Sequence, residues 1–195
     1  MNRIFYIMGK SASGKDSIYR DILGSSGLRP IILYTTRPMR TGEVDGKEYH
    51  FTDRKTFEAM QTAHSILEYR VYNTVQGEWI YFTSADSIDL KSGSYLGIGT
   101  LESYVKMKDY FGTEFVVPIY IDVEDGLRLE RAVKRERLEA NPKYTELCRR
   151  FISDSEDFLA EKIQAAGITK VFDNSGSIEL CIGEIRKYIN SFDQV

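Results

Sequence analysis

Short apolar runs alternate along the chain with segments in which apolar residues recur every three or four positions. The run Ile4-Phe5-Tyr6-Ile7-Met8 is almost continuously apolar, residues 115–123 form a second run of this kind, and residues 170–174, KVFDN, are a further strand candidate. Unbroken apolar runs are typical of parallel strands that are covered on both faces. The pattern therefore predicts an α/β fold with a central parallel sheet.

The segments between and after these runs have the period of amphipathic helices. After the first run, Ile18, Ile22 and Leu23 fall on one helical face. Residues 153–167 are predicted to form another helix. A further helix is predicted near residue 180, with one face made by Ile178, Ile182, Ile185 and Ile189.

A glycine-rich loop separates the first predicted strand from the helix after it. Residues 9–15, Gly-Lys-Ser-Ala-Ser-Gly-Lys, fit the pattern G-x-x-x-x-G-K of phosphate-binding loops. The two glycines let backbone N–H groups point at phosphate oxygens, and the helix N-terminus adds its positive dipole end. The predicted nucleotide-phosphate site comprises Gly9, Ser11, Ala12, Ser13, Gly14, Lys15, Asp16 and Ser17.

Asp16 stands where this pattern usually has a Ser or Thr that binds Mg²⁺. A carboxylate beside a triphosphate is repelled unless a cation lies between them, and Mg²⁺ prefers hard oxygen ligands. Asp is also favoured as a cap at helix N-termini. Two interpretations of Asp16 are therefore open, a metal ligand (directly or through water) and a helix cap.

Composition excludes several classes of protein. The 195 residues are 42% hydrophobic, which suits one domain with a sizeable core, and the net charge of −3 is not that of a polycation that binds nucleic acid. Cys148 and Cys181 lack metal-site spacing and are expected to be reduced thiols. Without a signal-peptide pattern or a membrane-length apolar stretch, we expect a cytoplasmic protein that binds neither nucleic acid nor membrane.

Residues 34–51, YTTRPMRTGEVDGKEYHF, place two arginines three positions apart among turn-forming residues. The guanidinium groups of Arg37 and Arg40 are suited to binding phosphate oxygens in pairs. The pattern T-T-R-x-x-R-x-G-E-x-x-G-x-x-Y resembles the nucleoside-monophosphate segment of guanylate kinases, with every fixed position present. The resemblance extends more loosely over nearly the whole chain.

This resemblance implies a site for GMP. Arginines and tyrosines at matching positions would hold the GMP phosphate, with an acidic residue beside the arginines. A glutamate would read the guanine edge, because a carboxylate accepts from the adjacent N1–H and N2–H₂ donors, and a hydroxyl would also contact the base. The implied GMP-binding residues are Arg37, Arg40, Glu43, Tyr49, Glu68, Tyr81 and Thr83.

The sequence departs from the family pattern in three places. Leu33 replaces a serine that helps to read guanine, and Phe82 replaces a glycine between the implied Tyr and hydroxyl residues. Residues 94–104, SYLGIGTLESY, contain no Asp where the family has Asp-x-Asp followed by Gln-Gly. One hypothesis is that Asp16 restores, from the glycine loop, the negative charge that this stretch lacks.

A basic segment, residues 127–150, carries eight basic and four acidic side chains, and Asn141-Pro142 is expected to divide it into two helical arms. Arginines that close over a transferring phosphoryl group stabilise its charge and keep out water. The segment resembles the lid of the kinase family. The implied catalytic residues are Lys15, Arg37, Arg131, Arg135 and Arg149, with Arg150 the alternative to Arg149.

The resemblance implies a P-loop NTPase fold of three layers, in one guanylate-kinase-like domain over residues 1–195. The implied reaction transfers the γ-phosphoryl group of ATP, bound with Mg²⁺, to GMP, in a monomer or homodimer. Asn174, in a stretch similar to the family's Val-Asn-Asp, would bind ATP near the adenine. The domain would comprise a core (1–32, 84–123 and 163–195), a nucleoside-monophosphate-binding insert (33–83) and a lid (124–162).

Two alternatives accompany this interpretation. Leu33 and the missing Asp-x-Asp are also compatible with a kinase of the same fold that uses another acceptor, either a different nucleotide or a ribosyl bisphosphate. A guanylate-kinase-like module without catalysis would instead bind a protein partner. The intact Gly9, Gly14 and Lys15 argue against such a module, because they are the residues that bind phosphate.

Overall fold

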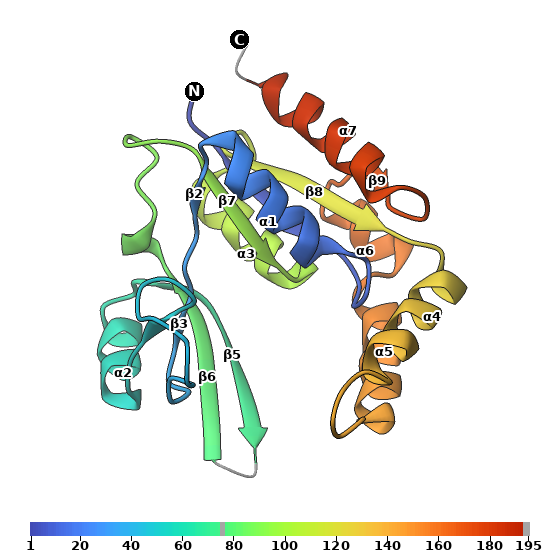
Figure 1. Cartoon of the computed structure of the whole chain (residues 1–195). Coiled ribbons are helices and arrows are strands. Elements are labelled where there is room, and N and C mark those ends of the chain that lie inside the picture. Colours follow the sequence, from blue (N-terminus) through green and yellow to red (C-terminus); the bar gives the residue numbers. More distant parts are fainter. Residues whose placement is uncertain (75–76, 193–195) are drawn as a thin grey trace.

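The computed structural model describes residues 1–74 and 77–192, and its centre is a five-stranded parallel sheet (Figure 1). The predicted α/β fold with a central parallel sheet is confirmed, since the two apolar runs and the segment 170–174 form strands of this sheet. The strands, in order across the sheet, are β2 (Arg29–Pro30), β7 (Tyr95–Gly99), β1 (Ile4–Met8), β8 (Val116–Asp122) and β9 (Val171–Asp173).

Strand β1 is the middle strand, and all five of its residues are buried. Phe5 and Ile7 face a core that is covered by α1 (Lys15–Ser26) and α7 (Ile178–Asn190). Its other residues face a second core, which α3 (Leu101–Phe111) covers. Strand β1 therefore lies between two helical layers, and the loop that follows it starts from a fixed position.

The predicted helix over residues 153–167 is wrong in extent. The structure has α5 (Tyr144–Asp157) and a short α6 (Ala160–Ala165), with a break between them. The ring of Phe158 is buried and stacks on Tyr120, with ring centroids 5.6 Å apart. Burying that ring turns the chain out of the helix, an interaction that the local 3.6-residue period does not reveal.

A second sheet lies within the predicted insert and has four strands. An antiparallel hairpin of β5 (Ile66–Thr74) and β6 (Gly77–Ser84) forms its main part. Phe82, which replaces a family glycine, is fully buried here and stacks on Tyr34. The remaining elements of this region are β3 (Tyr34–Thr35), β4 (His50–Phe51), α2 (Arg54–Thr62) and the 3₁₀ turn η1 (Ala85–Ser87).

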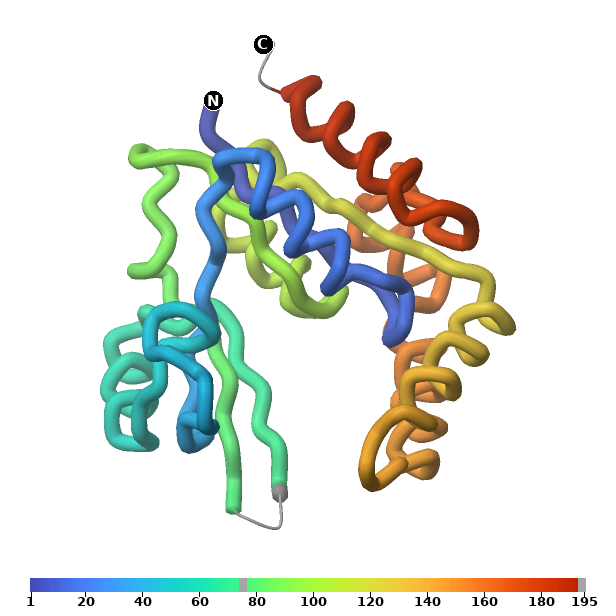
Figure 2. Tube along the Cα trace, viewed as in Figure 1, coloured from blue at the N-terminus to red at the C-terminus, as the bar shows by residue number. Residues whose placement is uncertain are grey.

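The basic segment forms α4 (Asp125–Glu136) and α5, joined by residues 137–143, which include Asn141-Pro142. The predicted division into two helical arms is confirmed, whereas the predicted core boundary at residue 163 falls inside α6. The second sheet and the α4–α5 pair project from the same side of the core (Figures 1 and 2). No helix in the described ranges has the length and apolar character needed to cross a membrane.

Candidate phosphoryl-transfer site

The glycine loop joins the end of β1 to the first turn of α1, as the sequence pattern predicts. A side chain at Gly9 would place its Cβ 2.5 Å from the carbonyl oxygen of Ile121 on β8. Gly14 has φ +87° and precedes the helix, and its carbonyl accepts from the N–H groups of Ser17 and Ile18. Both glycines of the pattern are therefore required by the backbone.

Asn174 supports this loop from the interior. Its side chain is 2% exposed, and its Nδ2 donates to the carbonyl of Ser13 at 2.8 Å. Its Oδ1 and the Oγ of Ser13 are buried without a hydrogen-bond partner. A Cβ on Gly14 would overlap the Asn174 amide. The structure thus places Asn174 against the loop backbone, and its role near the adenine stays a prediction.

Asp16 is the second residue of α1, and its side chain is 76% exposed. The helix begins after Gly14 without a side-chain cap, so Asp16 does not cap the backbone N–H groups. Its Oδ2 lies 3.8 Å from the Nζ of Lys15. An exposed carboxylate beside the predicted phosphate site has the oxygen chemistry that Mg²⁺ prefers. Asp16 would hold Mg²⁺ together with phosphate oxygens and water. No three acidic, His or Cys side chains gather among the described residues.

Arg37 and Glu43 form a bidentate pair beside β3. Nη1 and Nη2 of Arg37 donate to the two carboxylate oxygens at 3.0 and 2.7 Å, and the backbone N–H of Arg40 donates to Glu43 at 2.7 Å. Hydrogen bonding to Arg37, then to the Arg40 amide, lowers the pKa of Glu43. The same pairing raises the pKa of Arg37, which is 3% exposed. Glu43 therefore fixes the direction of the Arg37 guanidinium.

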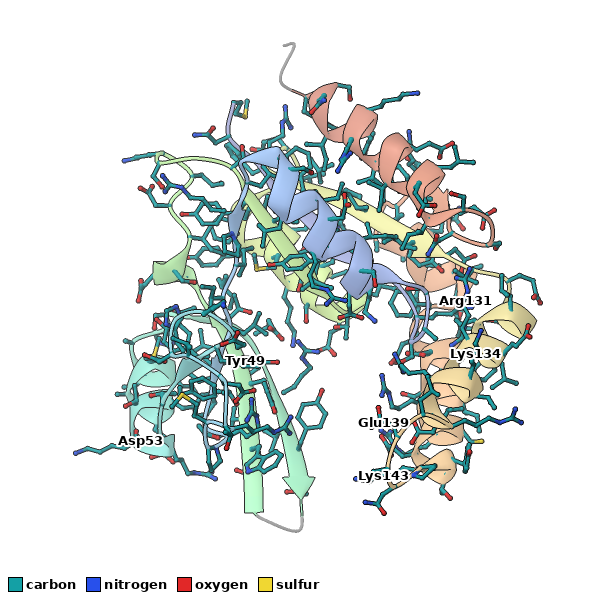
Figure 3. All side chains as sticks on the ribbon, in the orientation of Figure 1. Tyr49, Asp53, Arg131, Lys134, Glu139 and Lys143 are labelled. Atoms are coloured by element: carbon teal, nitrogen blue, oxygen red, sulfur yellow. The ribbon has the colours of Figure 1, made fainter. Side chains whose placement is uncertain are left out.

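Aromatic rings surround Arg37 on the insert. The rings of Tyr49 and Phe51 each lie 5.5 Å from its guanidinium carbon. Tyr49 also meets Tyr81 edge to face at 5.5 Å, so two predicted phosphate-contacting tyrosines are brought together. Tyr49 on the insert and Arg131 on α4 lie on opposite sides of the region below the core (Figure 3). The insert therefore gathers a cation and two phenols at one place.

Glu68 lies on β5, where the register with β6 shifts, and it is 4% exposed. The hydroxyl of Thr83 donates to its Oε1 at 2.8 Å, and the hydroxyl of Ser103 donates to its Oε2 at 3.2 Å. Arg70 adds an ion pair at 3.5 Å. The predicted pair of Glu68 and Thr83 is brought into contact. Ser103, on α3, was not predicted, because only the packing of α3 against β5 places it here.

The stretch without aspartates has a steric explanation. A Cβ on Gly97 would lie 2.6 Å from a ring carbon of Tyr6 on the neighbouring strand β1, and a Cβ on Gly99 would overlap the Tyr6 hydroxyl. Burial, then the charge of Glu68, raises the pKa of Tyr6, so this phenol stays neutral. The side chain of Tyr6 therefore fills the buried volume beside Gly99. Asp16, whose charge was proposed to replace that of the missing aspartates, lies elsewhere, on the exposed surface of α1.

The lid arginines occupy different environments. Nη1 of Arg131 donates to the carbonyl of Asn174 at 2.9 Å, next to the glycine loop. Arg149 pairs with Glu146 and is 64% exposed. Arg150 instead donates from Nη2 to the Oγ of Ser11 at 3.1 Å. Of the two alternatives that the sequence left open, Arg150 is the one that contacts the loop in this structure.

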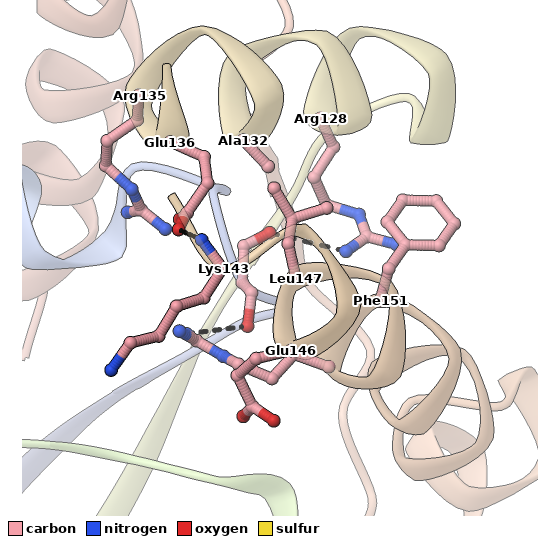
Figure 4. Close-up of a pocket in the computed structure, with 10 residues that line it drawn as sticks. Arg128, Ala132, Arg135, Glu136, Lys143, Glu146, Leu147 and Phe151 are labelled. Carbon is pink, nitrogen blue, oxygen red and sulfur yellow. Dashed lines mark hydrogen bonds between the residues drawn. The ribbon is translucent and has the colours of Figure 1, made fainter. Parts of the chain in front are cut away.

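A pocket of about 160 Å³ lies between α4, α5 and the loop (Figure 4). It is lined by basic side chains that include Arg135, Lys143 and Arg150, together with the acidic Glu136 and Glu146. Arg135 lines this pocket together with Ser11 of the loop. Basic side chains outnumber acidic ones in the lining of this pocket.

Residues 1–90 match the sequence model of the guanylate kinase family. A structural likeness extends further: the crystal structure of guanylate kinase from Anaplasma phagocytophilum covers 97% of this chain and 85% of its own, with a TM-score of 0.62 and 21% identity. Residues 1–90 are thus similar in sequence to guanylate kinases. At that identity the structural match shows a shared fold, and it includes the region of the lid.

The curated proteins that this chain resembles match it over shorter segments. Guanylate kinase of Thermus thermophilus is 44% identical over 70 residues, which are 36% of this chain and 32% of the relative. Guanylate kinase of Neisseria meningitidis is 37% identical over 87 residues, 44% and 40% of the two chains. Mouse MAGUK p55 subfamily member 4 is 33% identical over 89 residues, 45% of this chain and 13% of that protein. The matches thus span about a third of the first of these relatives.

The sequence match to the guanylate kinase family covers only part of the candidate site. The glycine loop and the predicted acceptor residues up to Thr83 lie within residues 1–90, where the guanylate kinase model matches. Arg131, Arg135 and Asn174 lie outside it. Those residues are therefore related to the family through the shared fold alone.

Proposed function

We propose that this protein is a member of the guanylate kinase family and an ATP-dependent nucleoside-monophosphate kinase, which converts ATP and GMP to ADP and GDP. The observation that supports it most is Glu68, a buried carboxylate whose two oxygens are both oriented by hydroxyl donors. Each oxygen retains a lone pair, so the carboxylate can accept from the two neighbouring N–H groups of guanine. Few other small-molecule edges present two such donors side by side.

The remaining residues suit the transfer step. The acceptor is the phosphate of GMP, which is anionic at neutral pH, so no protein nucleophile is required and positioning carries the reaction. Arg37, Arg40, Tyr49 and Tyr81 would hold the acceptor phosphate, and Lys15 would hold the β- and γ-phosphates of ATP. Mg²⁺ bound with ATP would neutralise phosphate charge, with Asp16 placed to hold it directly or through water.

We further propose that residues 33–83 act as the nucleoside-monophosphate-binding insert and residues 124–162 as the lid. Closing the lid would bring Arg131, Arg135 and Arg150 towards the transferring group and would exclude water, which otherwise accepts the phosphoryl group. Arg149, paired with Glu146 on the same helix, would contribute after that pair opens.

A coupled assay of ADP release over GMP, dGMP, AMP, CMP and UMP tests this proposal. Turnover with GMP and dGMP, well above that with the other three, is the expected result. ADP release that does not depend on any acceptor would contradict it, as would equal turnover with AMP and GMP.

A different acceptor is the second candidate, and two features favour it. Leu33 offers no hydroxyl to a base, and Tyr6 occupies the volume beside Gly99. The same assay with a ribosyl bisphosphate decides between the acceptors. A protein-binding module without catalysis is disfavoured by the intact Gly9, Gly14 and Lys15 of the phosphate loop.

A further inference from the structure

Ser11, the third residue of the glycine loop, is held by the lid helices through all three of its polar groups. Its backbone N–H donates to Oδ2 of Asp154 at 2.7 Å, and its carbonyl accepts from Nη1 of Arg128 at 3.3 Å. Its hydroxyl accepts from Nη2 of Arg150 at 3.1 Å. The two helices that supply these partners, α4 and α5, thus fix the peptide units on both sides of Ser11.

Arg128 is the centre of this contact, and its side chain is 1% exposed. It donates to Oδ1 of Asp125 from Nε and Nη2 at 3.1 and 3.0 Å, and to Asp154 at 3.3 Å. Its guanidinium carbon lies 3.9 Å from the centre of the Phe151 ring (Figure 4). A buried cation is stable only when it is fully paired, so Arg128 has one geometry available. It is therefore not free to close over a ligand.

The residue after Ser11 is in a conformation that alanine rarely adopts. Ala12 has φ +63°, in the left-handed region, where a Cβ is unfavourable. Such backbone persists only where the surroundings determine it. The carbonyl that Arg128 holds belongs to the peptide unit between Ser11 and Ala12, and the orientation of that unit is what φ of Ala12 describes.

We propose that Arg128 and Asp154 are positioning residues that keep the phosphate loop in its binding conformation by holding Ser11 against the strain at Ala12. This inference rests on the proposed function in so far as it takes ATP as the ligand of the loop. Neither residue touches the nucleotide in this scheme. Their contribution is to fix the loop before ATP arrives, so that binding does not have to order it.

The test replaces Asp154 by Asn and then adds Ala12→Gly. Asp154→Asn keeps the shape but loses the charge-assisted bond to Ser11, so we expect affinity for a non-hydrolysable ATP analogue with Mg²⁺ to fall about tenfold by calorimetry. Glycine accepts positive φ without strain, so Asp154→Asn with Ala12→Gly should return to within about twofold of the parent. Asp157→Asn, an exposed change on the same helix, should have no effect.

Amide hydrogen exchange at Ser11 in the ligand-free protein is the second readout. Exchange should accelerate about tenfold in Asp154→Asn and stay at the parent rate in Asp157→Asn. Failure of Ala12→Gly to restore affinity, or unchanged Ser11 exchange, overturns the inference. A parent that binds no ATP analogue refutes the proposed function, and Ser11 exchange then decides the inference alone. If Asp154→Asn does not fold, Arg128→Leu with Asp154→Leu, which removes both buried charges, carries the same measurements.

Discussion

The hydroxyl of Tyr6 lies where a side chain on Gly99 would begin. The two residues are on neighbouring parallel strands. Gly99 pairs with Met8, the last residue of β1 before the glycine loop, and Tyr6 lies two residues earlier on β1. The absence of an aspartate from β7 is thus coupled to the presence of a tyrosine on β1. The Tyr6 side chain fills the space that a side chain at position 99 would need.

Gly99→Ala should therefore destabilise the protein by about 1–3 kcal/mol, the usual cost of overpacking, because Tyr6 is a rigid, buried ring. In a Tyr6→Val background the same change should cost much less, since the overlapping hydroxyl is gone. Urea unfolding of the two single variants and the double variant gives the coupling energy. Gly24→Ala in α1, where nothing lies within 4 Å, is the control and should stabilise slightly. Equal stability of Gly99→Ala and the parent would contradict the steric account.

Lys15→Ala should reduce phosphoryl transfer by at least about 100-fold, the scale of removing one group that stabilises developing charge. The fold should be retained, because Lys15 is the first residue of α1 and its ion pair is with the exposed carboxylate of Asp16. The measurement is the coupled ADP-release rate at saturating acceptor, with melting temperature as the check on folding. Lys187→Ala, exposed on α7, should leave the rate unchanged. Near-normal turnover of a folded Lys15→Ala variant would remove the loop from the active site.

Glu68→Gln should raise the KM for GMP by about 10–100-fold, because one acceptor becomes a donor facing a guanine N–H and leaves it unpaired at about 1–3 kcal/mol. Ser103→Ala should act in the same direction and more weakly, since it only releases one carboxylate oxygen. The KM for ATP should not change in either variant. Glu102→Gln, the exposed neighbour of Ser103, is the matched control. A parallel rise in both KM values would point to a general disturbance of the fold instead.

Asp16→Ala should increase the Mg²⁺ concentration at half-maximal rate, whereas Asp16→Ser, which restores the common loop residue, should stay active near the parent's requirement. The physical reason is that Ala offers no oxygen to the ion or its water. Asp21→Ala, further along α1 and paired with Arg186, controls for the loss of one negative charge from the helix. An unchanged Mg²⁺ requirement in Asp16→Ala, with only a lowered melting temperature, would assign Asp16 to the helix dipole.

Glu43→Gln should destabilise the protein at pH 7, and this difference from the parent should shrink in acid. The pKa of Glu43 is lowered in the folded state, chiefly by the hydrogen bonds from Arg37. The contribution of Glu43 to the free energy of unfolding is therefore complete above its ordinary pKa of about 4.3. This contribution is lost as the pH falls through the lower pKa of the folded state. Urea unfolding from pH 7 down to pH 3 measures the effect. A difference that stays constant over this range would show that the charge of Glu43 is not what holds Arg37.

Local features of the chain could be predicted because their physics is local. The apolar run of β1, the glycines of the loop and the amphipathic period of α7 each depend on residues within a few positions of one another. The acceptor segment with Arg37 and Glu43 is local as well, since the two residues are six positions apart and pair across one turn. The sequence by itself therefore determined the fold class and two local parts of the candidate site, the glycine loop and the segment with Arg37 and Glu43.

Tertiary packing alone decided which distant residues complete that site. Ser103 meets Glu68 from 35 positions away, and Asp154 meets the Ser11 amide from 143 positions away. The same holds for Tyr6 and Gly99, whose overlap exists only because β1 and β7 pair in one register. Spacing along the chain carries no information on such pairs, since the contact depends on how helices and strands dock and not on the local backbone period.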